Sequence, residues 1–169
     1  VGGAELNVAV GASLLGLRTG VISKLPSHDI GSFMKGKIRS FGVSDDFFMY
    51  DDSPSARVGI YYYENGAYPR KPKVIYDRMN SSFFSLNIDE IPKEVYTASK
   101  CFHTTGITLA LSPQIRETTI EMIKRFKEAG TLVSFDVNFR GNLWSGDEAR
   151  ECILKILPYV DIFFCSEDT

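Results

Sequence analysis

Apolar residues recur along this chain at helical spacing in some stretches and as short continuous runs in others. The helical spacing predicts helices over residues 4–16, 29–41, 113–129 and 147–157. The short apolar runs predict strands over residues 19–25, 100–105, 131–136 and 159–165. Strands that alternate with helices of this length indicate an α/β fold, in which helices cover both faces of a mostly parallel sheet.

A different pattern interrupts this alternation in the first half of the chain. Two aromatic, β-rich runs occupy residues 58–64 and 74–78, and the segment between them contains Asn65-Gly66, two prolines and three basic residues. Such a segment favours a turn, so the two runs predict a hairpin or a small antiparallel sheet. We therefore expect an α/β body made of residues 1–50 and 81–169, with a small β lid inserted at residues 51–80.

Composition and charge narrow the classes of protein that need to be considered. The 169 residues are enough for one domain with a substantial core, and the formal net charge is −2 with a pI near 5.7. This charge gives no reason to expect nucleic acid or an anionic membrane as a partner. No apolar run approaches the roughly 20 residues that a membrane-spanning helix needs.

The three cysteines do not have the spacing of a disulfide framework or a zinc site. Cys101 and Cys165 fall in runs that predict buried strands, and Cys152 falls in a predicted amphipathic helix. We therefore expect reduced structural thiols and a cytoplasmic setting. The chain opens with Val1 and a Gly-Gly pair, from which we expect that it starts inside a motif.

Polar residues follow the predicted strand at 131–136, where open α/β sheets bind their ligands. Asp136 closes the strand, and Asn138 and Arg140 follow at alternate positions, so an extended backbone would point both side chains the same way. The planar guanidinium of Arg140 suits a carboxylate or a phosphate. The alternative is a loop that leads into a helix, in which the Asp and Asn only satisfy backbone groups.

Two further segments are candidates for binding. The glycines of Gly2-Gly3 permit close approach of a ligand to the backbone, and Asn7 follows one helical turn later, although a tight turn chosen for packing would have the same sequence. In the lid, Tyr76 and Arg78 lie on one face of a predicted strand, and residues 61–63 supply three tyrosines. The alternative there is a half-buried sheet face with a solvated arginine.

The remaining polar residues do not form a recognisable catalytic group. His103 lies within a predicted strand, where a core position is expected, and His28 precedes a helix, where a surface position is expected. The sequence contains no His/Asp/Glu cluster with the spacing of metal ligands and no Ser/His/Asp arrangement.

Taken together, these segments resemble the PfkB (ribokinase-like) family of carbohydrate kinases in order and in content. Residues 2–9 (GGAELNVA) are similar to the first signature of the family, and the β insertion matches its lid in position. Residues 106–112 (GITLALS), 136–140 (DVNFR) and 143–144 (LW) resemble the 2-keto-3-deoxygluconate kinases of the family in particular. The resemblance covers essentially the whole chain.

The resemblance implies a ribokinase-like three-layer sandwich with a β-sheet lid, of which this chain is an N-terminal half. It implies ATP and Mg²⁺ as cofactors and two sets of site residues. The residues implied for the sugar are Gly3, Ala4, Glu5, Leu6, Asn7, Tyr61, Tyr76, Asp77, Arg78, Ile107 and Arg140. Those implied for the nucleotide side are Asn138, Phe139, Arg140, Ser166 and Glu167.

The chain departs from the family pattern near its end. The Asn-x-x-Glu type of motif that the family associates with magnesium and phosphate has its counterpart at residues 166–169, where Ser166 takes the first place and Thr169 the last. The motif Gly-Ala-Gly-Asp, which carries the catalytic base in the family, is expected after Thr169, so no catalytic residue is expected within this chain.

The implied reaction transfers the γ-phosphoryl group of ATP to 2-keto-3-deoxygluconate and yields the 6-phosphate. A fructokinase or a 5-dehydro-2-deoxygluconate kinase would share the fold and the first signature. A non-catalytic module that binds sugar acids is the alternative from another class of protein. A lid can also form a dimer interface, so we expect a homo-oligomer assembled through the lid.

Overall fold

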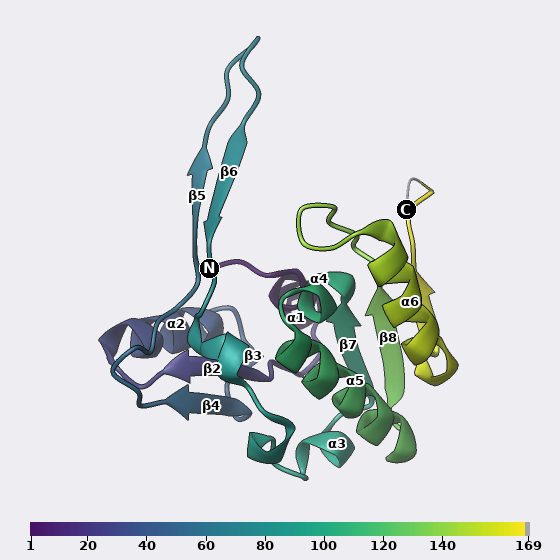
Figure 1. Ribbon diagram of the computed structural model, residues 1–169. Helices are drawn as coiled ribbons and strands as arrows, with labels where there is room; N and C mark the ends of the chain where they lie inside the picture. The colour runs from purple at the N-terminus through teal and green to yellow at the C-terminus, as the bar shows by residue number, and fades with distance from the viewer. Residues whose placement is uncertain (168–169) are drawn as a thin grey trace.

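The computed structural model describes residues 1–167 and contains an α/β body from which a two-stranded hairpin projects (Figure 1). The helices of the body are α1 (Ala4–Leu14), α2 (Asp29–Arg39), α3 (Val95–Ala98), α4 (Gly106–Ala110), α5 (Pro113–Glu128) and α6 (Gly146–Ile156). Its strands are β1 (Thr19–Gly20), β2 (Ser23–Pro26), β3 (Val43–Ser44), β4 (Phe48–Asp51), β7 (Cys101–Thr105), β8 (Leu132–Asp136) and β9 (Ile162–Phe164). Short 3-10 helices span Ser82–Ser85, Ile88–Glu90 and Leu157–Tyr159.

The strands of the body are all parallel, as the alternation of helices and strands predicts. β1 pairs with β3, β2 pairs with β4, and β8 lies between β7 and β9 in a three-stranded sheet. Within residues 1–167 no backbone ladder joins these three groups into one continuous sheet. The prediction of parallel pairing is therefore confirmed, whereas a single unbroken sheet is not observed in this part of the chain.

Helices cover both faces of the β7–β8–β9 sheet. Phe102 of β7 stacks on Phe126 of α5 with ring centroids 4.2 Å apart, so α5 covers one face. Thr105 lies on the opposite face of the same strand, because side chains alternate, and it donates a hydrogen bond to Glu5 of α1. α1 and α5 therefore pack against opposite faces, and the predicted order of layers is present.

Local capping signals explain where α5 and α6 begin. The Ser112 side chain accepts a hydrogen bond from the backbone N–H of Ile115, and Pro113 occupies the first turn of α5. Ser145 and Glu148 form a reciprocal capping box at the start of α6. Both devices can be read from the sequence, and the observed helices begin within one residue of the predicted ones.

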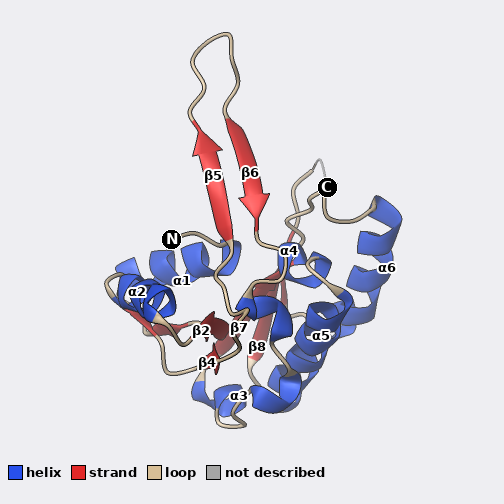
Figure 2. Cartoon of the chain, turned by 60° about the vertical axis from the view of Figure 1, so that its left-hand side comes forward, coloured by secondary structure: helices blue, strands red, loops and turns tan. Residues whose placement is uncertain are grey.

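The lid is an antiparallel hairpin of β5 (Ile60–Glu64) and β6 (Lys73–Asp77), as predicted (Figure 2). Tyr61 lies opposite Tyr76, and Tyr62 lies opposite Ile75. The side chains of both strands are exposed along their whole length. Because a two-stranded hairpin is marginal by itself, its direction depends on contacts at its base.

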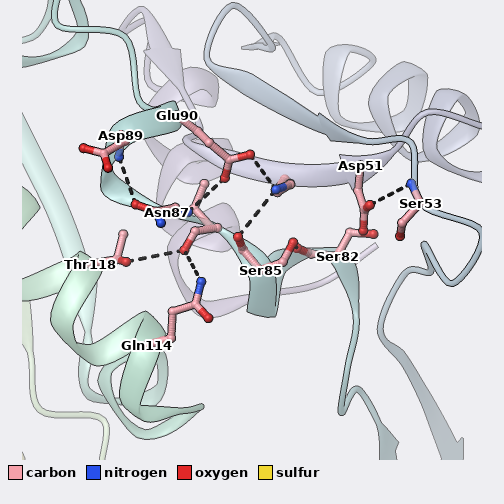
Figure 3. Close-up of polar contacts among 11 residues, drawn as sticks. Asp51, Ser53, Ser82, Ser85, Asn87, Asp89, Glu90, Gln114 and Thr118 are labelled. Carbon is pink, nitrogen blue, oxygen red and sulfur yellow. Dashed lines mark hydrogen bonds and ion pairs between the residues drawn. The ribbon is translucent and has the colours of Figure 1, made fainter.

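A polar cluster holds the segment after the lid against the rest of the body (Figure 3). Lys24 of β2 is 9% exposed, and its Nζ lies 2.6 Å from Oε1 of Glu90. The carbonyl of Leu86 accepts hydrogen bonds of 3.4 Å from both Gln114 and Thr118 of α5. These bonds connect β2 to α5 through the short helices between residues 82 and 90.

Three details differ from the sequence predictions. The strand predicted at 19–25 is divided into β1 and β2, and the last strand is limited to Ile162–Phe164. Cys101 and Cys165 are exposed rather than buried, whereas Cys152 is buried as expected. The reason is position: Cys101 opens β7, and Cys165 follows β9, which pairs on one side only among the described residues.

Candidate functional site

The glycine turn before α1 lies directly beneath the lid. A Cβ atom placed on Gly2 would lie 3.3 Å from the hydroxyl oxygen of Tyr61, so β5 passes close to this backbone. Gly3 has φ 148°, a conformation that L side chains rarely adopt. α1 begins at the next residue, Ala4, and Asn7 is exposed one turn later. The backbone of the turn is thus exposed, and one tyrosine of the lid lies next to it.

One face of the lid combines aromatic rings with an arginine. The rings of Tyr61 and Tyr76 lie 6.3 Å apart across the hairpin, and the guanidinium of Arg78 lies 4.6 Å from the centre of the Tyr76 ring. Stacked arginine and tyrosine side chains offer an apolar surface together with donors for oxygen atoms. The predicted pairing of Tyr76 with Arg78 on one face is confirmed.

Asp77 is engaged elsewhere, although it was predicted beside these residues. Its Oδ2 lies 2.8 Å from Nη2 of Arg57, which also donates hydrogen bonds to the carbonyls of Asp77 and Met79. Arg57 therefore links the segment that precedes β5 to the end of β6, at the base of the lid. The Asp77 carboxylate is committed to this base contact.

Two more of the predicted sugar-lining side chains have structural partners. Leu6 is 9% exposed and packs in the smaller hydrophobic cluster with Leu25 and Ile38. Oε1 of Glu5 accepts hydrogen bonds from Thr105 and Thr108. Leu6 is therefore a core side chain. No local pattern predicts that Glu5 contacts residues about 100 positions away.

The segments after β7 and β8 lie against each other. A Cβ on Gly106 would lie only 2.1 Å from the carbonyl oxygen of Val137, so the absence of a side chain permits this contact. Ile107, half-buried in the first turn of α4, follows directly. The carboxyl ends of neighbouring parallel strands thus form one edge, where ligands of α/β proteins bind.

The loop after β8 is not extended, which corrects one prediction. Asn138 has φ 36°, and its backbone N–H donates a 3.0 Å hydrogen bond to Oδ1 of Asp136. Asparagine tolerates this left-handed conformation because its short side chain can bond locally. Asn138 and Arg140 therefore do not alternate along a strand. Arg140 is exposed and donates to the carbonyl of the half-buried Phe139.

The residues predicted for phosphate and metal are only partly described. Ser166 and Glu167 are exposed beyond β9, and the predictions for Asp168 and Thr169 lie outside the described residues. Within residues 1–167, no group of three His, Cys, Asp or Glu side chains could hold a metal ion. The described part of the chain also has no helix long and apolar enough to cross a membrane.

His103 is half-buried, where a core position is expected from the sequence, and it lies on the same face of β7 as Thr105. Its Nδ1 lies 2.9 Å from the hydroxyl of Ser134, and its Nε2 is buried without a hydrogen-bond partner. Burial lowers the pKa of His103, although the nearby charges of Glu5 and Asp136 act in the opposite direction.

These contacts link the predicted site segments in series. The lid touches the glycine turn through Tyr61, α1 touches the end of β7 through Glu5, and Gly106 touches the segment after β8. The site that results is a backbone turn, an aromatic lid with Arg78, and an exposed Arg140 at the edge of a parallel sheet. Such a site suits a polyhydroxylated ligand that carries negative charge.

The chain is similar to several known proteins over nearly its whole length. It is 41% identical over 165 residues to a 2-dehydro-3-deoxygalactonokinase of Haloferax volcanii, covering 98% of this chain and 51% of that protein. It is 33% identical to a 2-dehydro-3-deoxygluconokinase of Bacillus subtilis, covering 84% of this chain and 43% of that protein. The chain thus spans about half the length of the curated relatives it matches.

Solved structures agree with the fold. The crystal structure of a 2-dehydro-3-deoxygluconokinase from Thermotoga maritima matches with a TM-score of 0.89 and 33% identity, covering 96% of this chain and 49% of that one. The model of the pfkB family of carbohydrate kinases matches residues 1–169. The resemblance of the motifs and the ribokinase-like fold are thereby confirmed, and the chain belongs to the pfkB family of carbohydrate kinases.

Proposed function

We propose that the whole protein phosphorylates a 2-keto-3-deoxy sugar acid, 2-keto-3-deoxygluconate, on its terminal hydroxyl, and that this chain supplies the sugar-binding residues. The observation that carries the proposal is the lid face above the glycine turn, where Tyr61 lies over Gly2 and Arg78 stacks on Tyr76. The tyrosine rings match the faces of a sugar, and a guanidinium matches the carboxylate of a sugar acid. Fructose carries no carboxylate for this arginine to bind.

The names of several relatives support a sugar acid as the substrate, although other relatives are named for a neutral sugar. Those of Haloferax volcanii, Bacillus subtilis and Thermotoga maritima are named for 2-dehydro-3-deoxy acids. A relative in Arabidopsis thaliana, 34% identical, is named a probable fructokinase, and one in Shouchella clausii, 30% identical, a 5-dehydro-2-deoxygluconokinase. Fructokinase and 5-dehydro-2-deoxygluconokinase are therefore the alternative activities within the family. The epimeric acid 2-keto-3-deoxygalactonate is a further substrate to compare, because the Haloferax volcanii relative is named for it.

ATP is the proposed phosphoryl donor. A sugar kinase of Pyrococcus horikoshii, 28% identical with a TM-score of 0.82, was crystallised in complex with ATP. In this chain the guanidinium of Arg140 is exposed at the sheet edge and spends one donor on Phe139, so further donors face outward for phosphate oxygens. Bound Mg²⁺ would neutralise charge on the phosphates, but the described residues provide no cluster to hold it.

The proposed contribution of this chain is positioning and charge stabilisation. The lid excludes water and orients the sugar through Tyr61, Tyr76 and Arg78. Arg140 stabilises the negative charge on the phosphoryl group during its transfer. Phosphoryl transfer depends mainly on these two effects, together with a base that accepts the hydroxyl proton. No base is assigned among the described residues.

A coupled ADP-release assay on the whole protein tests the proposal. The substrates are 2-keto-3-deoxygluconate, 2-keto-3-deoxygalactonate, 5-dehydro-2-deoxygluconate and fructose at equal concentration. We expect a 2-keto-3-deoxy acid to give the highest kcat/KM, and Arg78→Ala to lower that value about tenfold or more because a charge-assisted bond to the carboxylate is lost. Arg140→Ala should lower kcat more than it raises the KM of the sugar.

Arg150→Ala is the matched control, because Arg150 is an exposed arginine on α6, away from the lid. Its kinetics should match those of the wild type. Fructose as the best substrate, with activity indifferent to Arg78→Ala, would contradict the choice of substrate and leave the family unaffected. A protein that binds the acids without releasing ADP would favour the non-catalytic sugar-acid module.

We also propose that a second copy of the chain covers the outer face of the lid. Tyr61 faces the glycine turn, so the alternation of side chains directs Tyr62 and its partner Ile75 to the opposite face, where they are 57% and 53% exposed. Sedimentation of the whole protein should give a homo-oligomer that Tyr62→Glu dissociates. A monomeric wild type at micromolar concentration would refute this interface.

A further inference from the structure

The carboxylate of Glu5 is bound from the side of the protein body. Its Oε1 accepts hydrogen bonds from the backbone N–H of Thr105 at 3.0 Å, from the Thr105 hydroxyl at 3.0 Å and from the Thr108 hydroxyl at 2.6 Å. Thr105 is 1% exposed, so two of these donors are removed from water. Bonds from buried donors to an ionised acceptor are among the stronger hydrogen bonds in proteins.

These bonds join two segments of the candidate site that are far apart in sequence. Glu5 belongs to the first turn of α1, immediately after the glycine turn that Tyr61 covers. Thr105 ends β7 and is the N-cap of α4, and Thr108 lies in that helix next to Ile107. Thr105 makes no side-chain cap within its own helix, and its hydroxyl donates to Glu5.

We infer that Glu5 is a positioning residue that fixes the glycine turn against the start of α4, and that it does not ligate the substrate. The inference rests on the proposed function only for the identity of the ligand. A free carboxylate in this place would repel the carboxylate of a sugar acid, whereas three donors on one oxygen offset much of its charge.

A double-mutant cycle on the whole protein tests this role. Glu5→Ala removes the acceptor, and Thr108→Val removes one donor with little change of shape. Each variant should raise the KM of the sugar, Glu5→Ala by about tenfold or more, and leave the KM of ATP unchanged, because a shift of the turn misplaces only the sugar. The double variant should be little worse than Glu5→Ala alone, both in KM and in urea unfolding, because the two residues share one interaction.

Glu5→Gln keeps a carbonyl oxygen that the same donors can bond, so it should recover part of the loss. Glu117→Ala is the control, since Glu117 is an exposed helical glutamate with no described hydrogen bond or ion pair. If Thr108→Val behaves as wild type while Glu5→Gln is as impaired as Glu5→Ala, Glu5 is a direct ligand and the inference is wrong. Additive effects on unfolding would also overturn it, whether or not the wild type phosphorylates a sugar.

Discussion

Replacing Gly106 by alanine is expected to separate the ends of the two central strands of the site. The new Cβ would lie 2.1 Å from the carbonyl oxygen of Val137 and 3.2 Å from its carbonyl carbon. Ordinary contact begins at 3.4 Å, so the atom is about 1.3 Å too close to a backbone that has no rotamer to change. Overpacking of this kind costs about 1–3 kcal/mol of folding free energy.

The functional consequence of Gly106→Ala should exceed its effect on stability. A displacement of about 1 Å in groups that orient a substrate can cost about a hundredfold in rate, and Ile107 and Arg140 lie on the two segments that must separate. We would measure urea unfolding and kcat/KM for the sugar on the whole protein. We expect a lower urea midpoint and a fall in kcat/KM of about tenfold to a hundredfold.

Gly36→Ala provides the matched control, because nothing lies within 4 Å of a Cβ at that position in the interior of α2. Alanine there should raise stability by about 0.5–1 kcal/mol, since glycine loses more backbone entropy on folding. If Gly106→Ala retained wild-type stability and kinetics, the close contact between the two strand ends would not exist in the protein. Ile107 would then not lie beside the loop after β8.

Two further predictions concern stability. His103 has a pKa lowered from its ordinary 6.5, chiefly by burial, so below about pH 6.5 the unfolded chain binds a proton that the folded chain resists. The urea midpoint should fall as the pH is lowered from about 7.5 to about 5.5, and His103→Gln should flatten this decline; an equal decline in the variant would exclude His103 as its source. Glu90→Gln should destabilise the protein by about 1–3 kcal/mol, more than Lys24→Met, because it leaves the ammonium of Lys24, whose side chain is 10% exposed, without its ion-pair partner. The Glu90 side chain is 35% exposed and remains hydrated when Lys24 is removed, so equal or reversed effects in urea unfolding would contradict this ordering.

The sequence by itself was sufficient for features that depend on neighbouring residues. Ser112-Pro113 and Ser145 with Glu148 mark the starts of α5 and α6, because a cap bonds within one turn of its own helix. The placement of Tyr76 and Arg78 on one lid face follows from the alternation of side chains along a strand. Helix caps and side-chain alternation depend only on residues close together in the sequence, so they can be predicted without knowledge of the fold.

Only the tertiary structure decided which polar groups bond to one another across the chain. Glu5 has the same local sequence whether it faces a sugar or Thr105, and Asp77 is adjacent to Arg78 yet pairs with Arg57. The left-handed Asn138 and the exposure of Cys101 likewise depend on where the strands end and on what lies beside them. Side-chain periodicity fixes the face on which a residue lies, but the partner that it meets is set by elements packed from distant parts of the chain.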